Sequence, residues 1–226
     1  MEIGAGHKSK MPCPNSDHME SEKSEVTSFT ESFSKYHIPK LKDAWPQVES
    51  ALQEHGISYT LNLAELYMTV STTPRTKDPD IIHRAREIIV LLSKTTVPTY
   101  VVIDILNGDM HHDHIKTGYQ EGGLAAIHGI KKERFDKRRT RFLENLKDLA
   151  CLMSCHLYVN VRFLTCANEQ GNTVTAAGTS LEHVKVVRMV VGRCYVENVN
   201  PATIVSRLKM RKDMLNVERR LQALLM

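Results

Sequence analysis

The chain has 226 residues, of which 42% are hydrophobic and 25% are charged, so it has the composition of a folded protein with a buried core. Its five cysteines form no C-x-x-C pair and leave one over, which excludes an evident disulfide framework or zinc knuckle. No segment approaches the roughly 18 apolar residues of a membrane span, and the N-terminus lacks an apolar signal-peptide core. A soluble intracellular protein is therefore expected.

The net charge of +4 is unevenly distributed along the chain. Residues 1–34 carry three Lys and six Asp or Glu, residues 35–130 carry nine basic and eleven acidic side chains, and residues 131–226 carry eighteen basic and nine acidic ones. The net charges of the three parts are −3, −2 and +9. Such an excess of positive charge in one part suits a polyanionic partner there and not elsewhere, although a basic, solvated surface has the same composition.

Residues 1–34 are rich in Ser, Glu, Lys and His and have almost no apolar periodicity, which predicts a disordered tail. The folded pattern begins near Lys35. Apolar residues at helical spacing predict a helix over 38–56 that ends at Gly56. Alternating apolar and polar residues over 57–72 predict two strands joined by a short turn.

Residues 74–94 carry the clearest helical pattern in the chain, with Asp78 and Pro79 suited to the first turn. A short helix over 97–108 is expected to close at Gly108. The remaining expected elements are a strand over 113–119, a helix over 131–154, strands over 156–161 and 171–178, a helix over 180–198 and a last helix over 201–226. The chain is thus predicted to be α+β, with two repeats of roughly eighty residues.

The segment KKERFDKRRTRF, residues 131–142, places seven basic side chains in twelve residues. On a helix, four of them share one face, because their spacings are three, four and three; these are Lys131, Arg134, Arg138 and Arg141. Lys137 lies on the flank of that face, and Phe135 and Phe142 form an apolar stripe beside it. Such a helix can bury the stripe and present charge to phosphates, whereas the plainer interpretation is a solvated helix face.

The order strand, basic helix, helix, strand, strand, helix over residues 113–198 resembles a K-homology (KH) domain of the eukaryotic kind, in which a GXXG loop between the first two helices holds the nucleic-acid backbone. The run KERFDKRRTRF, followed later by QGNTVTAAG, is similar to the KRR-R motif family of the small-subunit processome, whose members have two KH domains. Residues 44–98 resemble the first KH domain of that family throughout. The resemblance covers about residues 35–200.

The resemblance implies a fold of two tandem KH-like domains and a division of the chain into a tail (1–34), a degenerate, protein-docking first domain (35–110), a basic second domain (111–200) and an amphipathic C-terminal helix (201–226). It implies a nonenzymatic ribosome biogenesis factor that binds the precursor of the small-subunit ribosomal RNA, for 40S assembly and 18S rRNA maturation. The implied partners are this RNA and other processome proteins, one of them docked on the first domain, without a cofactor, a small-molecule substrate or a membrane. The implied location is the nucleus and nucleolus.

The RNA-contacting residues expected in the second domain are all basic: Lys131, Lys132, Arg134, Lys137, Arg138, Arg139, Arg141 and Lys147. The sequence departs from the family in lacking a glycine loop after the basic helix, where Glu144, Asn145 and Leu146 stand instead. Without glycine, side chains obstruct the approach of backbone amides to phosphates. Residues 161–169 resemble an insertion between two strands, whose Arg162 and Phe163 either contact RNA or fill the loop.

Three other functions remain open on sequence grounds. The first is an interaction scaffold that has lost RNA binding and uses the basic helix against acidic protein surfaces. The second is the related two-KH assembly factor that acts near the 3′ end of the small-subunit RNA; the missing glycine loop and the KRR-x-R run argue against it. The third is a metal-dependent hydrolase built on residues 111–114, but on a strand His112 and His114 share one face while Asp113 points away.

Overall fold

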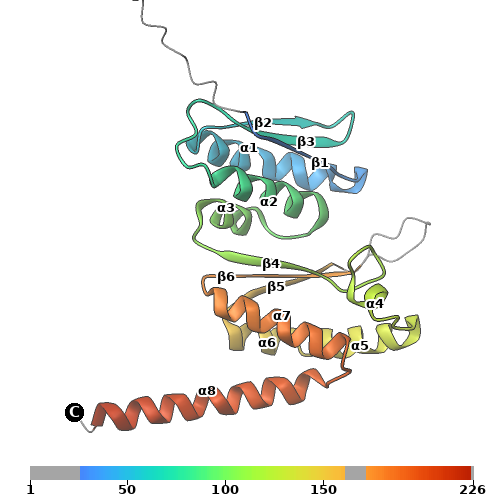
Figure 1. The fold of residues 1–226 in the computed structure, drawn as a ribbon, viewed down its shortest axis with the longest axis vertical. Coiled ribbons are helices and arrows are strands. Elements are labelled where there is room, and N and C mark those ends of the chain that lie inside the picture. Colours follow the sequence, from blue (N-terminus) through green and yellow to red (C-terminus); the bar gives the residue numbers. More distant parts are fainter. Residues whose placement is uncertain (1–25, 161–171, 225–226) are drawn as a thin grey trace, which may run out of the picture.

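The computed structural model describes residues 26–160 and 172–224, which form two stacked α+β units and a long final helix (Figure 1). The first unit contains β1 (Ser28–Ser32), the 3-10 turn η1 (Lys35–His37), α1 (Ile38–Glu54), β2 (Ile57–Asn62), β3 (Tyr67–Thr72), α2 (Ile81–Lys94) and α3 (Thr99–Asn107). The second unit contains β4 (His111–Lys116), α4 (Leu124–Ile127), α5 (Lys132–Glu144), α6 (Leu146–Met153), β5 (His156–Asn160), β6 (Thr173–Gly178) and α7 (Leu181–Tyr195). The final helix is α8 (Pro201–Leu224). The predicted α+β class is confirmed.

Each unit is built on a three-stranded antiparallel sheet in which the last strand lies in the middle. The strand orders are β1-β3-β2 and β4-β6-β5. Phe29 lies opposite Val70 in the first sheet, and His114 lies opposite Thr175 in the second. In the first unit the long helix α1 joins the first two strands. In the second unit the first two strands are joined by the short α4 and then by α5 and α6. Only the second unit therefore has a pair of helices between which a KH loop can stand.

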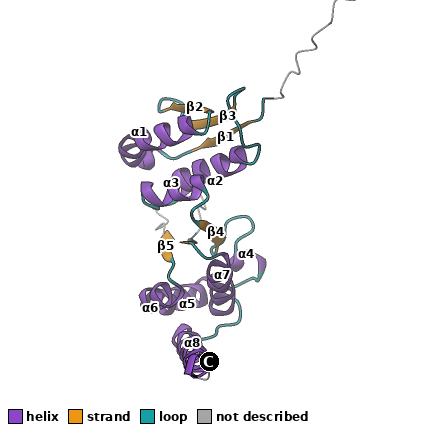
Figure 2. Ribbon diagram, turned by 90° about the vertical axis from the view of Figure 1, so that its left-hand side faces the viewer, coloured by secondary structure: helices purple, strands orange, loops and turns teal. Residues whose placement is uncertain are grey.

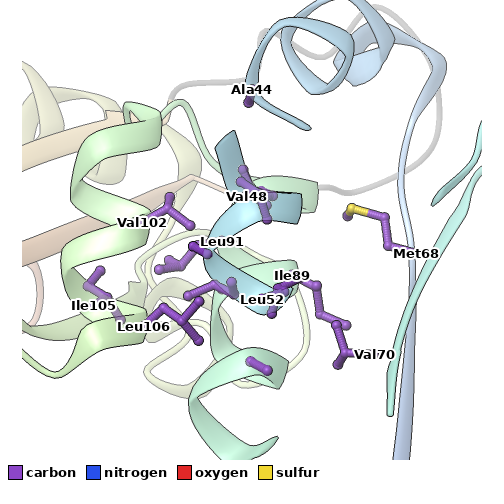
Figure 3. Close-up of a cluster of buried hydrophobic side chains, with 14 of the residues drawn as sticks. Ala44, Val48, Leu52, Met68, Val70, Ile89, Leu91, Val102, Ile105 and Leu106 are labelled. Carbon is purple, nitrogen blue, oxygen red and sulfur yellow. The ribbon is translucent and has the colours of Figure 1, made fainter. Parts of the chain in front are cut away.

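The core of the first unit lies between its sheet and its helices (Figure 3). The apolar residues predicted to face inward on α1 and α2 are buried, except Trp45, which is partly buried, and Val48, Leu52 and Ile89 are exposed by 1% or less. Helix α3 ends, as expected, at Gly108, whose φ of 87° lies in the left-handed region that glycine adopts without strain. The periodicity of the sequence therefore located this core correctly.

Helix α3 separates the two units, with α2 on one side and the second sheet on the other (Figures 1 and 2). Ala177 of β6 is fully buried within the core of the first unit, and Tyr158 of β5 packs against the same core. The ring of Tyr100, at the start of α3, meets His156 edge-on at 6.2 Å between centroids. One face of the second sheet is thus covered by the first unit and its other face by α6 and α7, against which α5 packs.

The first folded unit begins earlier in the chain than predicted, because strand β1 lies within residues 1–34, which were expected to be a disordered tail. Phe29 packs against the first core and Phe33 is buried, which gives this short strand enough apolar contact to be held at the edge of the sheet. Alternation over only five residues, SFTES, is too short a pattern to reveal it. Residues 1–25 and the proposed insertion at 161–169 lie outside the described residues.

The single helix expected over 131–154 is two helices, α5 and α6, separated only by Asn145. The apolar period continues across the break, so the periodicity gave no sign of it, whereas the resemblance to a KH domain placed a junction of two helices at residues 144–146, where the structure has it. The four-residue helix α4 was also not expected. None of the helices in the described ranges is long and apolar enough to cross a membrane.

Candidate nucleic-acid interface

The two phenylalanines of α5 fix the orientation of the basic helix. Phe135 and Phe142 are each 1% exposed, and their rings lie 5.5 and 5.6 Å from the ring of Tyr195 at the end of α7. Phe135 also lies 5.5 Å from the ring of Tyr119. The predicted apolar stripe therefore faces the core of the second unit, and the rotation of every basic side chain about the α5 axis follows from it.

Arg138 is partly buried and is bonded to the end of α7. Its Nη1 donates hydrogen bonds to the carbonyl oxygens of Tyr195 at 2.6 Å and Val196 at 3.2 Å. These carbonyls belong to the last turn of α7, where helical acceptors lack partners and a positive charge is favourable. Arg138 therefore caps α7 across 57 residues of sequence.

Two further arginines of the basic run also have partners inside the chain. Arg139 lies 3.1 Å from the carboxylate of Asp136 and 5.9 Å from the centroid of the Phe135 ring, and only 20% of its side chain is exposed. Arg141 donates from Nη2 to Oδ1 of Asn198 at 2.5 Å. Arg138 and Arg141 thus hold α5 against the end of α7 and the residues after it, whereas both partners of Arg139 lie on α5 itself.

The other five predicted residues are exposed, and within the described ranges no hydrogen bond or ion pair engages their side chains. They are Lys131, Lys132, Arg134, Lys137 and Lys147, hereafter the outer cations. Four come from α5 and its N-cap, and Lys147 comes from the first turn of α6. Because their charges are solvated and uncompensated, they can meet phosphates without breaking an existing contact.

The junction of α5 and α6 offers no glycine loop. Asn145 alone joins the helices, and its side-chain amide donates to the carbonyl of Arg141 at 2.9 Å. Its backbone N–H is bonded to the preceding helix, with the carbonyl of Phe142 at 3.1 Å. The junction has no glycine that would let backbone amides come close to a phosphate without an intervening side chain, so side-chain charge is the main means of phosphate contact there.

The histidines after α3 lie on β4 with the alternation expected for a strand. His112 and His114 face helix α2, with His112 Nε2 at 4.0 Å from a carboxylate oxygen of Glu87, whereas Asp113 pairs with Arg188 of α7 on the other side. Burial lowers the pKa of His114 to about 4, and the nearby Lys94 contributes to the shift. Among the residues that the structure describes, no group of three His, Cys, Asp or Glu is placed to hold a metal ion.

Sequence reasoning missed a hollow at the N-terminal end of α5. His128 and Gly129 line it together with Lys131 and Arg134. The signal was a glycine two residues before the basic run, but without α4 in the prediction there was no reason to expect a turn that faces the helix.

Comparison with known proteins identifies the first unit. Residues 27–107 match the family model described as the Krr1 KH1 domain. The match begins at β1 rather than at Lys35 and ends with α3, so it coincides with the first unit of the structure.

Solved structures share the fold of nearly the whole chain. A protein of unknown function, APE0754, from Aeropyrum pernix has a TM-score of 0.63 at 12% identity, covering 88% of this chain and 98% of its own. A chain in the a/eIF2alpha–aDim2p–rRNA complex from Pyrococcus horikoshii has a TM-score of 0.62 at 15% identity, covering 85% and 97%. Dim2p from the same organism has a TM-score of 0.59 at 13% identity, covering 81% and 99%. The predicted fold of two tandem KH-like domains is confirmed.

Proposed function

We propose, from the match of residues 27–107 to the Krr1 KH1 domain and from the fold of two KH-like units, that this Krr1-like KH protein is a nonenzymatic RNA-binding factor of ribosome biogenesis. In its specific form the proposal is a component of the small-subunit processome, in the nucleolus, that binds precursor rRNA for 40S assembly and 18S rRNA maturation. The observation that carries the RNA-binding part is the set of outer cations. The second domain is the part that contacts RNA.

The charge distribution supports this division of labour. The net charge is +9 over residues 131–226 and −2 over 35–130. Attraction to a polyanion, through release of the ions condensed on it, increases with the number of phosphates that Lys and Arg neutralise. One of the structures with this fold was solved in a complex that contains rRNA, which is a precedent for the proposed ligand.

The first domain is proposed to dock another processome protein. Only one long helix joins its first two strands, so it has no helix pair to carry an RNA loop, and its sheet turns a face of hydroxyl side chains away from the helices. Thr30 bonds Thr69 and Ser28 bonds Ser71 on that face, at 2.9 Å in both pairs. A flat, uncharged face has little attraction for RNA and is compatible with a protein partner.

The scaffold alternative is favoured by one specific observation, the single-residue junction at Asn145. If the glycine loop were indispensable, the second domain would dock on acidic protein surfaces through the same outer cations. The two functions differ in what the outer cations bind, and this can be measured directly.

The test compares two charge reversals in the whole protein. Lys132→Glu with Lys137→Glu changes two outer cations, and Lys42→Glu with Lys77→Glu, at exposed positions of the first unit, makes the same change in net charge. We expect the first pair alone to weaken binding to single-stranded RNA and to lower the slope of log affinity against log salt by about 1.4, since each contact with a single strand contributes about 0.7.

Crosslinking in growing cells, followed by sequencing of the attached RNA, then identifies the ligand. Crosslinks in precursor small-subunit RNA that are lost in Lys132→Glu/Lys137→Glu, but kept in the control, are the expected result. Equal RNA binding by both pairs, with retained co-purification of assembly proteins, would instead establish the scaffold.

A further inference from the structure

A hollow of about 270 Å³ lies where α4 ends, α5 begins and α7 ends. Its lining consists of residues 128–131, Arg134, Arg138 and Val196. A water molecule takes about 30 Å³ of liquid volume, so the hollow has room for a phosphate group together with several waters. It lies at the opposite end of the 13-residue α5 from Asn145, about 20 Å away at 1.5 Å per residue.

The side chains of the hollow supply positive charge and few acceptors. Lys131 and Arg134 are outer cations, His128 is exposed, and no Asp or Glu is among the lining residues. Arg138 is held in place by its two bonds to the end of α7, and both use Nη1. Its guanidinium is therefore oriented in advance with its other nitrogens uncommitted by those bonds, which lowers the entropic cost of binding a forked acceptor such as phosphate.

The backbone adds to the positive character of the hollow. Gly129 has a φ of 56°, in the left-handed region, and the N–H of Ile130 donates to the carbonyl of Ala125 at 3.0 Å. This turn ends α4 and directs the chain into α5. The first bond of α5 runs from the N–H of Phe135 to the carbonyl of Lys131, so the amides before Phe135 precede the helical ladder. Lys131, the N-cap residue, has no side-chain oxygen to cap them.

We propose that this hollow binds a phosphate of the RNA backbone, at a site separate from the α5–α6 junction. The inference rests on the proposed RNA-binding function of the second domain and adds where one phosphate is held. Two arginines and a lysine around a recess match the charge and the hydrogen-bonding geometry of phosphate. No Phe, Tyr or Trp is among the lining residues, so the hollow lacks the large aromatic rings on which bases commonly stack, and its charge favours the backbone phosphate.

The first measurement is a titration of the isotope-labelled whole chain with inorganic phosphate, followed by NMR, with chloride at matched ionic strength as the reference. We expect the amide signals of Gly129 and of residues 131–134 to shift with phosphate and not with chloride. In Arg134→Gln, which keeps an exposed polar side chain, these shifts are expected to be lost. The matched control Lys42→Gln, at an exposed position of the first unit, is expected to retain them.

The second measurement is single-stranded RNA affinity as a function of salt. Arg134→Gln is expected to lower the slope of log affinity against log salt by about 0.7. If the variant and the original protein bind equally at 1 M salt, this difference in slope makes the affinity of the variant about fivefold lower at 0.1 M. If Lys132→Glu/Lys137→Glu weakens RNA binding while Arg134→Gln changes neither slope nor affinity, the hollow is not the phosphate site and the proposed function stands. If neither variant affects RNA, both proposals fail. Amide shifts induced by an acidic peptide but not by phosphate would assign the hollow to a protein carboxylate and overturn the inference.

Discussion

Lys137 and Arg138 are neighbours in the sequence, yet their side chains have different surroundings. Arg138 turns toward the end of α7 and bonds two of its carbonyls, whereas Lys137 is exposed and has no partner in the part of the chain that the structure describes. The difference follows from the 100° between successive residues of a helix whose phenylalanine face is buried. The basic side chains of α5 therefore do not form a uniform surface. Charge reversal at Arg138 would change both RNA binding and the stability of the fold, so the two effects could not be separated.

Replacing Arg138 by Ala is expected to destabilise the protein by about 1.5–3 kcal/mol, the range for hydrogen bonds that involve a charged group. Urea unfolding monitored by circular dichroism measures the change. Lys137→Ala is the matched control and should alter the free energy of unfolding by less than about 0.5 kcal/mol, as is usual for an exposed position. Equal stability of the two variants would show that the bonds to Tyr195 and Val196 do not hold α5.

Strand β1 shows how an element can be fixed by its neighbours. Its five residues pair with β3 along their whole length, and the N–H of Phe33, just after the strand, bonds the carbonyl of Leu66 at 2.9 Å. The guanidinium of Arg86 on α2 lies 5.0 Å from the centroid of the Phe29 ring. The strand therefore completes the first domain, although its local sequence is mostly polar.

A protein that begins at residue 34 should consequently be less stable than one that begins at residue 26. The shorter chain loses the burial of Phe33, which is 7% exposed, and the pairing of β3 with β1. Burying one phenylalanine is worth roughly 1.5–3 kcal/mol, so a loss of at least about 2 kcal/mol in the free energy of unfolding is expected. Thermal unfolding of the two truncated proteins measures the difference. Equal stability of the two would show that residues 26–33 do not contribute to the first folded unit.

At the scale of the whole molecule, the junction of the two units contains partly buried histidines. His112 and His114 of β4, with His83, Arg86 and Glu87 of α2, line a hollow of about 280 Å³. Burial lowers the pKa of both β4 histidines, to about 4 for His114. Each is neutral in the folded protein at a pH where it takes up a proton in the unfolded chain.

Stability should therefore rise with pH between about 4 and 6.5, because the unfolded chain binds more protons than the folded one in that window. Acidification through this range is expected to destabilise the molecule, and His114→Gln is expected to reduce the dependence. Unfolding free energies at several pH values test this, with His183→Gln on the exposed surface of α7 as control. An unchanged pH dependence in His114→Gln would place the proton uptake at other groups.

The sequence alone determined the elements with long apolar periods, the two-repeat α+β layout, the concentration of positive charge in the second half and the buried stripe of α5. Each of these depends on residues close in the chain, and so is written in local spacing. Only the tertiary structure decided that Arg138 and Arg141 have partners beyond α5, that β1 belongs to the first sheet and that His128 meets Arg134 around a hollow. Most of these contacts join residues that are distant in the sequence, such as Arg138 and Tyr195 or Ser28 and Ser71. They form only when separate elements pack together, and the spacing of residues along one element does not determine how that packing occurs.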